Sequence, residues 1–398
     1  MKLAALALMC LAGALFCGCE ARSVEDLPRS TRIDRDIVAR ASLALSESQG
    51  AAVARDATFF TRDDGTFVFH MSHDSDPQNP MYHGVSAFAR QVSVRSGGTM
   101  AVEVFGGPDS LGSDAALVAM VTEGRLDSAM VQLWSAWSGM SDLANLESLP
   151  FLFSDVEEAM AAYTGALGEW VAENVINPTG SVVIGWQKNG FRHFTNNVRP
   201  IFTPADVAGL RMRSPRNEIH LAFYDAMGAG SVAMDFGEVR DAIDRGLVNG
   251  QDNPIGNIFA ARLAEVQDYL SLSYHMFSAA PFVVSRDLWD ALTDGQRGIL
   301  VESAAAANDF NMRVTEEMER TMLNALIAGG MQVNEADAGS FFDDALLLVW
   351  ETHMDSFGRE FVDIAAGYVS DPSALVHLFS SAGPPAGAEP EDEGEEEE

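Results

Sequence analysis

Cysteine, basic side chains and long apolar runs are all scarce in this sequence. The chain of 398 residues has three cysteines, Cys10, Cys17 and Cys19, all close to its start. Its 25 basic residues stand against 58 acidic ones, a formal net charge of -33. Such a surface repels phosphate backbones, so nucleic acid is not expected as a partner. The apolar run Leu3–Phe16 is too short to span a bilayer.

The first 19 residues instead have the anatomy of a secretory signal. Signal peptidase II requires a small residue before the lipidated cysteine; Gly18 precedes Cys19, whereas Phe16 precedes Cys17. The segment resembles a bacterial lipobox in which Phe16 replaces the preferred leucine. We expect lipid on Cys19 and a periplasmic protein that touches a membrane only through this anchor. The alternative is a signal that is cleaved without lipid attachment. Cleavage at Cys19 leaves one thiol, so no intrachain disulfide is expected.

Two further segments at the ends differ from the rest of the chain. Residues 20–64 are mixed in charge and rich in serine, which predicts a tether. Residues 383–398 begin with Gly383-Pro384-Pro385 and end in a run of glutamates, which predicts a disordered acidic tail because like charges repel. A hydrophobic content of 47% leaves ample material for a folded core between them.

Alternating strand and helix patterns begin after the tether. Strands are predicted over 66–71, 100–105 and 128–132, with helices over 81–95 and 114–123 between them. This order predicts a parallel sheet flanked by helices, whose ligands lie beyond the carboxyl ends of the strands. The loops after Met71, Phe105 and Gln132 are therefore the ones that we expect to contact a ligand.

The second half repeats this style. Strands are predicted over 181–186 and 210–213, followed by helices over 218–227 and 236–245. Thr293 and Gln296 form a capping box that opens an apolar-periodic stretch reaching about Leu326. A helix of that length exceeds what one small domain needs, so we expect it to span two domains.

Four ordered motifs lie in the centre of the chain. They are Trp186–Asn196, Leu210–Pro215, Met234–Val239 and Gly246–Pro254. Their order and spacing resemble the extracytoplasmic solute-binding proteins of TRAP transporters, of the dicarboxylate-binding (DctP) type. The resemblance covers roughly residues 67–336.

This resemblance implies an α/β, two-domain, periplasmic-binding-protein-like fold, hinged as a trap. Domain I takes 65–189 and about 279–316, and domain II takes 190–278 and about 317–375. It also implies the capture of a small organic acid and its delivery to two TRAP membrane subunits, without catalysis. A sensor that serves a signalling receptor and a surface lipoprotein without a transport role are the alternatives.

The same resemblance assigns roles to individual side chains. Arg213 matches the arginine that clamps the substrate carboxylate, a task that suits its planar, two-bond geometry. Arg192 matches a second arginine of the site, Asn253 a polar contact, and Phe236 an aromatic that packs on the substrate. From the domain I loops we nominate Met71, Gln132 and Trp134 as further ligand contacts.

Four positions depart from the family pattern. Arg240, Asn249 and Asp252 stand where tyrosine, aspartate and glutamate are usual, and Ser214 replaces a usual apolar residue beside the clamp. Arg240 adds charge near the expected cleft wall, so the ligand can differ from a simple dicarboxylate in its second anionic group or its size.

Other chemical motifs fail on inspection. Residues 228–233 fit GxGxxA but run from a helix into a strand, the reverse of a dinucleotide-binding turn. His70 and His73 are three residues apart and point to opposite faces of a strand, which does not favour a metal site. No GxSxG, HExxH or P-loop sequence is present, so neither a catalytic centre nor a cofactor is expected.

Overall fold

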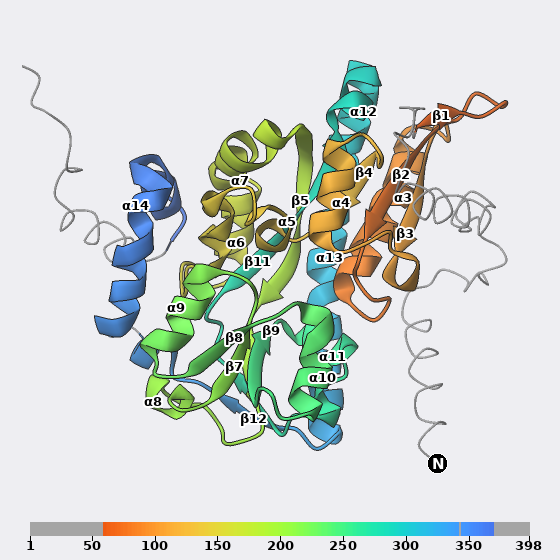
Figure 1. The fold of residues 1–398 in the computed structure, drawn as a ribbon. Coiled ribbons are helices and arrows are strands. Elements are labelled where there is room, and N and C mark those ends of the chain that lie inside the picture. Colours follow the sequence, from red (N-terminus) through yellow and green to blue (C-terminus); the bar gives the residue numbers. More distant parts are fainter. Residues whose placement is uncertain (1–58, 342–343, 370–398) are drawn as a thin grey trace, which may run out of the picture. The chain divides into compact units, whose positions relative to one another are not determined.

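The computed structural model describes residues 59–341 and 344–369 (Figure 1). The predicted signal, the lipidation site at Cys19, most of the tether and the acidic tail lie outside these residues. The described chain forms two six-stranded sheets.

The first sheet is mixed. Its strands are β1 (Phe60–Thr61), β2 (Phe67–His73), β3 (Met100–Gly106), β4 (Ser128–Met130), β5 (Ser181–Phe191) and β11 (Phe277–Ser285). β2 pairs in parallel with β3 and β4, which confirms the predicted order of the first three strands. β11 was not predicted, and it pairs antiparallel with both β4 and β5.

Helices connect the strands of this sheet and pack against it. The predicted helices are α3 (Pro80–Arg95) and α4 (Asp114–Thr122), and after β4 come α5 (Leu133–Trp137), α6 (Val156–Tyr163) and α7 (Ala166–Val171). The short turns η3 (Gly107–Asp109), η4 (Asp142–Ser148), η5 (Ala172–Ile176) and η6 (Asn177–Thr179) connect them. Asn79 caps α3 by accepting a hydrogen bond from the Met81 amide, and Pro80 occupies the first turn, where no amide is required.

The second sheet has the order β12-β10-β6-β9-β7-β8. These strands are β6 (His193–Asn196), β7 (Arg211–Ser214), β8 (Gly230–Ala233), β9 (Gly250–Asn253), β10 (Tyr269–Leu272) and β12 (Gln332–Glu335). Around them lie α8 (Pro204–Val207), α9 (Glu218–Ala226), η7 (Phe236–Glu238), α10 (Val239–Asp244), α11 (Ile255–Ala260) and η8 (Leu263–Glu265). The helix predicted over 236–245 is thus a 3-10 turn followed by a short α-helix.

The chain passes between the sheets at two short connections and along one helix. β5 continues through Arg192 into β6, and β10 returns to β11 through residues 273–276. After α12 (Arg286–Ala291), the 35-residue helix α13 (Asp294–Ala328) begins at the predicted Thr293–Gln296 capping box. Its Leu300 and Ala304 belong to the core of the first sheet, and its Met322 and Leu326 to that of the second. The predicted helix that spans both sheets is confirmed.

The last described elements are η9 (Ala338–Phe341) and α14 (Asp344–Ala366). α14 is broken at Gly358, whose φ of 77° is not helical. It packs on α7 near the first sheet and on α9 near the second. In the part of the chain that the structure describes, no helix is long and apolar enough to cross a membrane.

Two boundaries differ from the sequence analysis. β1 lies inside the predicted tether, because Phe60 pairs with Val68 of β2 and the Phe59 ring packs on Phe67 at 5.6 Å. β2 continues past Met71 to His73, because the whole strand pairs with β3.

Candidate ligand-binding site

The carboxyl ends of strands from the two sheets face each other across two asparagine bridges. Asn79, after β2, donates from Nδ2 to Oδ1 of Asn257 in α11, which follows β9, at 2.7 Å. Asn217, the cap of α9 after β7, donates from Nδ2 to Oδ1 of Asn145 in η4 at 2.7 Å. The space between these strand ends is therefore the candidate site, as expected for ligands of α/β sheets.

Arg213 ends at this edge with a charge that lacks a counter-ion. Its side chain is 2% exposed, and Nε and Nη2 both donate to the Met234 carbonyl oxygen, at 3.1 and 2.8 Å. It forms no ion pair with any other residue in the described ranges. Burial, and then the nearby Arg192, lower the pKa of Arg213 to about 10, so it stays charged at neutral pH. A buried cation with unused N–H donors suits a carboxylate ligand.

Arg192, in contrast, is already paired. Its Nε lies 2.6 Å from Oδ2 of Asp252, and its Nη2 donates to the Asp252 carbonyl oxygen at 2.5 Å. The Tyr224 hydroxyl donates to Asp252 Oδ1 at 2.5 Å, and Nε2 of His220 and of His275 lies 2.9 and 3.1 Å from this carboxylate. Asp252 is thus the centre of a buried polar cluster that the sequence analysis missed, because its members come from four distant segments.

The charge state of this cluster follows from its surroundings. Burial opposes the charge of Asp252, but Arg192 and the histidine hydrogen bonds hold the pKa of Asp252 well below its usual value. Burial lowers the pKa of His220 to about 4 and lowers that of His275, so both rings are neutral at pH 7. Arg192 and Asp252 therefore cancel, and Arg213 carries the remaining positive charge.

The other nominated residues of the second sheet lie beside this cluster. The Phe236 ring lies 5.9 Å from the Arg213 guanidinium, and its side chain is 39% exposed. Asn253 is buried next to Asp252 and donates to Gln251 Oε1 at 2.5 Å.

At the facing end of the first sheet, the buried ionisable residues near the site include two acids, in contrast to the arginines of the second sheet. Asp114, the first residue of α4, is buried; the Ser135 hydroxyl donates to its Oδ2, and its Oδ1 has no partner among the described residues. Glu147 in η4 is also buried, and it accepts hydrogen bonds from the amides of Ala279 at 2.7 Å and Trp134 at 3.3 Å. Burial raises the pKa of Glu147 to about 8 and that of Asp114 well above its usual value.

Sequence reasoning missed both acids. Asp114 begins the predicted helix over 114–123 and could have been considered, whereas nothing local marks Glu147 as buried. Their neighbour Gln132 was nominated. It is half-buried at the end of β4 and accepts from Asn189 Nδ2 at 3.2 Å.

The other two nominations from the first sheet lie in different surroundings. Met71 is 0% exposed and lies in the apolar core with Phe69 and Phe88, two residues before the end of β2. Because β2 is longer than predicted, Met71 lies inside the strand, and its role as a ligand contact stays a prediction. Trp134 is half-buried in α5, where its backbone amide bonds Glu147; its indole remains a candidate contact.

In the described chain, three other ionisable residues, Arg240, His70 and His73, form no hydrogen bond or ion pair with a nominated site residue. Arg240 bonds Glu265 at 2.7 Å and the Arg262 carbonyl oxygen at 2.7 Å, and it is exposed, so its charge is balanced. His70 lies 3.2 Å from Asp127 and 3.5 Å from Glu103, whereas both ring nitrogens of His73 lack a described partner. The described residues contain no group of three acids, histidines or cysteines that could hold a metal ion.

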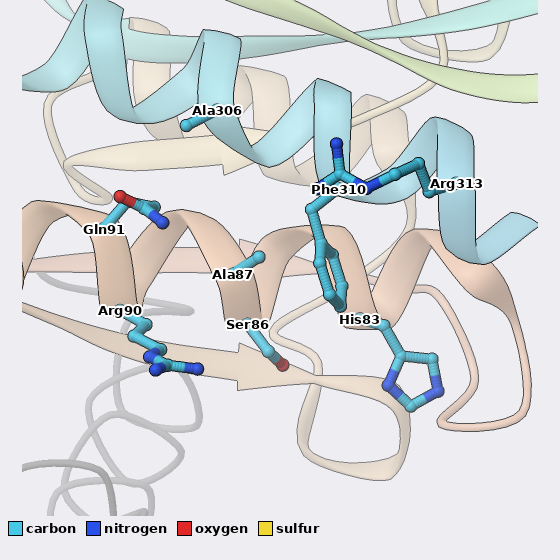
Figure 2. A pocket seen from close by; sticks show the side chains of 8 residues that line it. All are labelled: His83, Ser86, Ala87, Arg90, Gln91, Ala306, Phe310 and Arg313. Atoms are coloured by element: carbon cyan, nitrogen blue, oxygen red, sulfur yellow. The ribbon is translucent and has the colours of Figure 1, made fainter. Parts of the chain in front are cut away.

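A separate groove lies between α3 and α13 (Figure 2). Its volume is about 280 Å³, and Phe310 points into it from α13 toward α3. Its Arg90 and Arg313 are exposed, so an anion there stays hydrated and is held weakly. None of the nominated site residues lines it.

Comparison with known proteins identifies the family. Residues 71–355 match the profile of bacterial extracellular solute-binding protein family 7, DctP. The chain belongs to this family. Its DctP fold is shared with solved TRAP periplasmic solute-binding proteins, which are mixed α/β proteins of two domains. The resemblance inferred from the four central motifs is thereby confirmed.

Individual DctP relatives carry more specific descriptions. The chain is 30% identical over 307 residues to protein y4mM of Sinorhizobium fredii, covering 77% of this chain but 56% of that protein. It is 27% identical to the 2,3-diketo-L-gulonate-binding periplasmic protein YiaO of Escherichia coli, covering 73% of this chain and 88% of that protein. Among solved structures, a TRAP periplasmic solute-binding protein of Sulfitobacter with bound β-D-galacturonate is 26% identical, with a TM-score of 0.70, covering 76% of this chain and 100% of that one.

Proposed function

We propose that this protein captures a small organic acid by its carboxylate, at Arg213, and delivers it to the membrane subunits of a TRAP transporter. The observation that carries the proposal is the buried Arg213 guanidinium, which no described acid balances. Burying such a charge is costly unless a partner completes it, and a ligand carboxylate is a natural partner. Galacturonate and 2,3-diketo-L-gulonate, named for two relatives, are both carboxylates.

The other site residues take supporting roles in this proposal. Phe236 packs on the ligand beside Arg213, and Asn253 and Gln132 offer amide groups from opposite sides of the site. Arg192 acts mainly through Asp252, since its charge is already paired with that carboxylate. Trp134 closes the site from α5. The task is binding without chemistry.

Capture further requires closure of the two domains, one built on each sheet. We propose domain I as 65–189 with about 279–316, and domain II as 190–278 with about 317–375. The asparagine bridges then belong to the closed state, and the connections at Arg192 and 273–276 bend as the hinge.

A membrane anchor at Cys19 completes the proposal. Only this cysteine follows a small residue, Gly18. Metabolic labelling with a palmitate analogue should mark the wild type and not Cys19→Ala; label that persists there but disappears in Cys17→Ala places the lipid on the other cysteine.

The experiment that tests ligand capture is a thermal-shift screen of the protein against a library of organic acids and neutral analogues. A ligand at about 100 times its Kd stabilises the fold by roughly 2.7 kcal/mol. We expect hits among carboxylates and none among the corresponding amides. A library in which neutral compounds bind as well as acids contradicts the proposal.

A further inference from the structure

The two arginines of the site supply only one unbalanced positive charge. Arg192 lies close enough to Arg213 to lower the pKa of Arg213, and the buried carboxylate of Asp252 balances Arg192. Two guanidinium groups and one carboxylate leave a net charge of +1. The neighbouring histidines add nothing, because burial lowers the pKa of His193 to about 3 and keeps His220 neutral as well.

Other charges near Arg213 do not alter this balance. Asp235 follows Met234, but its carboxylate is exposed and pairs with Arg216 at 3.1 Å, so water screens it. Lys188, the buried lysine near the hinge, lies 3.2 Å from Glu319 of α13 and is likewise balanced.

The facing end of the first sheet offers no cation for a second carboxylate. Its buried acids include Asp114 and Glu147, and neither forms an ion pair with a described basic residue. His73, at the end of β2, is also buried, but burial lowers its pKa to about 4, so it is neutral at pH 7. If these acids are ionised they repel a second carboxylate, and if they are protonated they leave it unbalanced. In both states they can bond a hydroxyl group, and the partnerless Oδ1 of Asp114 and the amide of Gln132 add to this capacity.

We infer that the ligand is a hydroxylated monocarboxylate, held by its single carboxylate at Arg213 and by its hydroxyl groups at Asp114, Glu147 and Gln132. The inference rests on the proposed capture of a carboxylate and adds the number of charges that the site accepts. A C4-dicarboxylate, or any acid with a carboxylate at both ends, is selected against because its second charge is buried without a partner.

Matched pairs of acids test this directly. D-gluconate and D-glucarate differ only at C6, which is a hydroxymethyl group in one and a carboxylate in the other, and D-galactonate and galactarate form a second such pair. Uronates, erythronate and succinate complete the set. Titration calorimetry on the full-length protein gives the ratio of the two Kd values for each pair.

We expect at least one monocarboxylate to bind, and its dicarboxylate twin to bind about 100-fold or more weakly, the scale of an unpaired buried charge. A dicarboxylate that binds as tightly as its twin, or succinate as the best ligand, overturns the inference and leaves the proposed carboxylate capture standing. If the best acid from the wider screen carries no hydroxyl group, the inference alone fails; if no acid in the wider screen binds, both fail.

One variant should change the ratio between the Kd values of a dicarboxylate and its monocarboxylate twin. Asp252→Asn removes the balancing charge of Arg192 and raises the net charge to +2, so the ratio should narrow about tenfold or more. An unchanged ratio in folded Asp252→Asn contradicts the charge count. If that variant does not fold, the wild-type ratio still decides the inference. Arg313→Met, in the groove of Figure 2, is the control and should leave the ratio as it is.

Discussion

The two sheets present opposite chemistry at the ends that face each other. The second sheet ends in a buried cation, Arg213, next to a balanced pair, Arg192 and Asp252. The first sheet ends in buried acids, Asp114 and Glu147. In the proposed site, the second sheet attracts a single carboxylate, and the first sheet accepts the uncharged polar part of the same molecule. Affinity and selectivity are divided between the two sheets.

The largest effect is expected on the second sheet, at Asp252. Asp252→Asn leaves the Arg192 guanidinium buried without its counter-ion, which costs about 3–5 kcal/mol of unfolding free energy. Urea denaturation of the ligand-free protein measures this loss. The double variant Asp252→Asn/Arg192→Met should recover a large part of it, because the Arg192 charge is then removed together with its partner. A double variant as unstable as the single one contradicts the pairing.

In the same region, substitution of Arg213 should change ligand affinity much more than it changes the free energy of unfolding. Arg213→Met should weaken ligand binding by about 2–5 kcal/mol, roughly 30-fold to several thousand-fold in Kd. Arg213→Lys should fall between it and the wild type, because lysine keeps the charge but not the two-bond geometry. The free energy of unfolding should change by less than about 1 kcal/mol, since the lost bonds to Met234 are offset by removal of an unpaired buried charge.

The matched control for Arg213 is Arg216→Met. Arg216 lies three residues away, is exposed, and pairs with exposed Asp235, so its loss should leave the Kd nearly unchanged. Equal affinity in Arg213→Met and Arg216→Met removes the basis for a carboxylate clamp.

The first sheet also contains acids that lie away from the site and pair with a basic group. Asp127 and Glu103 both lie next to the His70 ring, unlike Asp114 and Glu147, which form no ion pair with a described residue. Burial disfavours the charged form of His70, but the hydrogen bonds that its ring donates to Asp127 and Glu103 outweigh this and raise the pKa of His70 to about 9. Since the folded pKa exceeds the unfolded value of about 6.5, the stabilisation is complete below about pH 6.5 and is lost as the pH rises through about 9.

His70→Gln should therefore reduce the fall in unfolding free energy between pH 6.5 and 9.5 by up to about 2 kcal/mol. Urea midpoints at the two pH values measure it, with His353→Gln as the control because burial lowers the pKa of His353. A wild-type pH dependence in His70→Gln means that His70 is not charged in the folded protein.

The smallest effect on ligand affinity is expected from the asparagine bridges that connect the facing ends of the two sheets. Asn257→Ala removes the 2.7 Å bond to Asn79 and should weaken ligand binding by about 1 kcal/mol, close to fivefold. Asn174→Ala is the control, because among the described residues the Asn174 side chain donates only to the Trp170 carbonyl oxygen, near the first sheet. A loss that is the same in both variants assigns no role in closure to the bridge.

Local patterns in the sequence were enough for the early strands, their helices and α13. The Thr293–Gln296 capping box placed the start of α13 within one residue, because a cap is a contact between near neighbours. β11 escaped prediction, since its nine residues are all buried and show no alternation. Its pairing with β4 and β5 depends on segments more than 85 residues away.

The candidate site likewise contains residues that local motifs predicted and residues whose roles depend on distant contacts. Arg213 and Phe236 come from motifs whose order carries the family resemblance, and the structure brings them within 5.9 Å. The pairing of Arg192 with Asp252 joins residues 60 apart, so no local pattern reveals that the charge of Arg192 is balanced. The same holds for Glu147, whose burial depends on Ala279, 132 residues away.

The central claim, that Arg213 binds the ligand carboxylate, is tested most directly by a cycle that changes both partners. The best acid from the screen and its primary amide are titrated into the wild type and into Arg213→Met by calorimetry. The wild type should prefer the acid by at least about 2 kcal/mol, and Arg213→Met should show nearly equal affinity for the two, because the changes are coupled only if the groups interact. An undiminished preference for the acid in Arg213→Met would show that the carboxylate binds elsewhere.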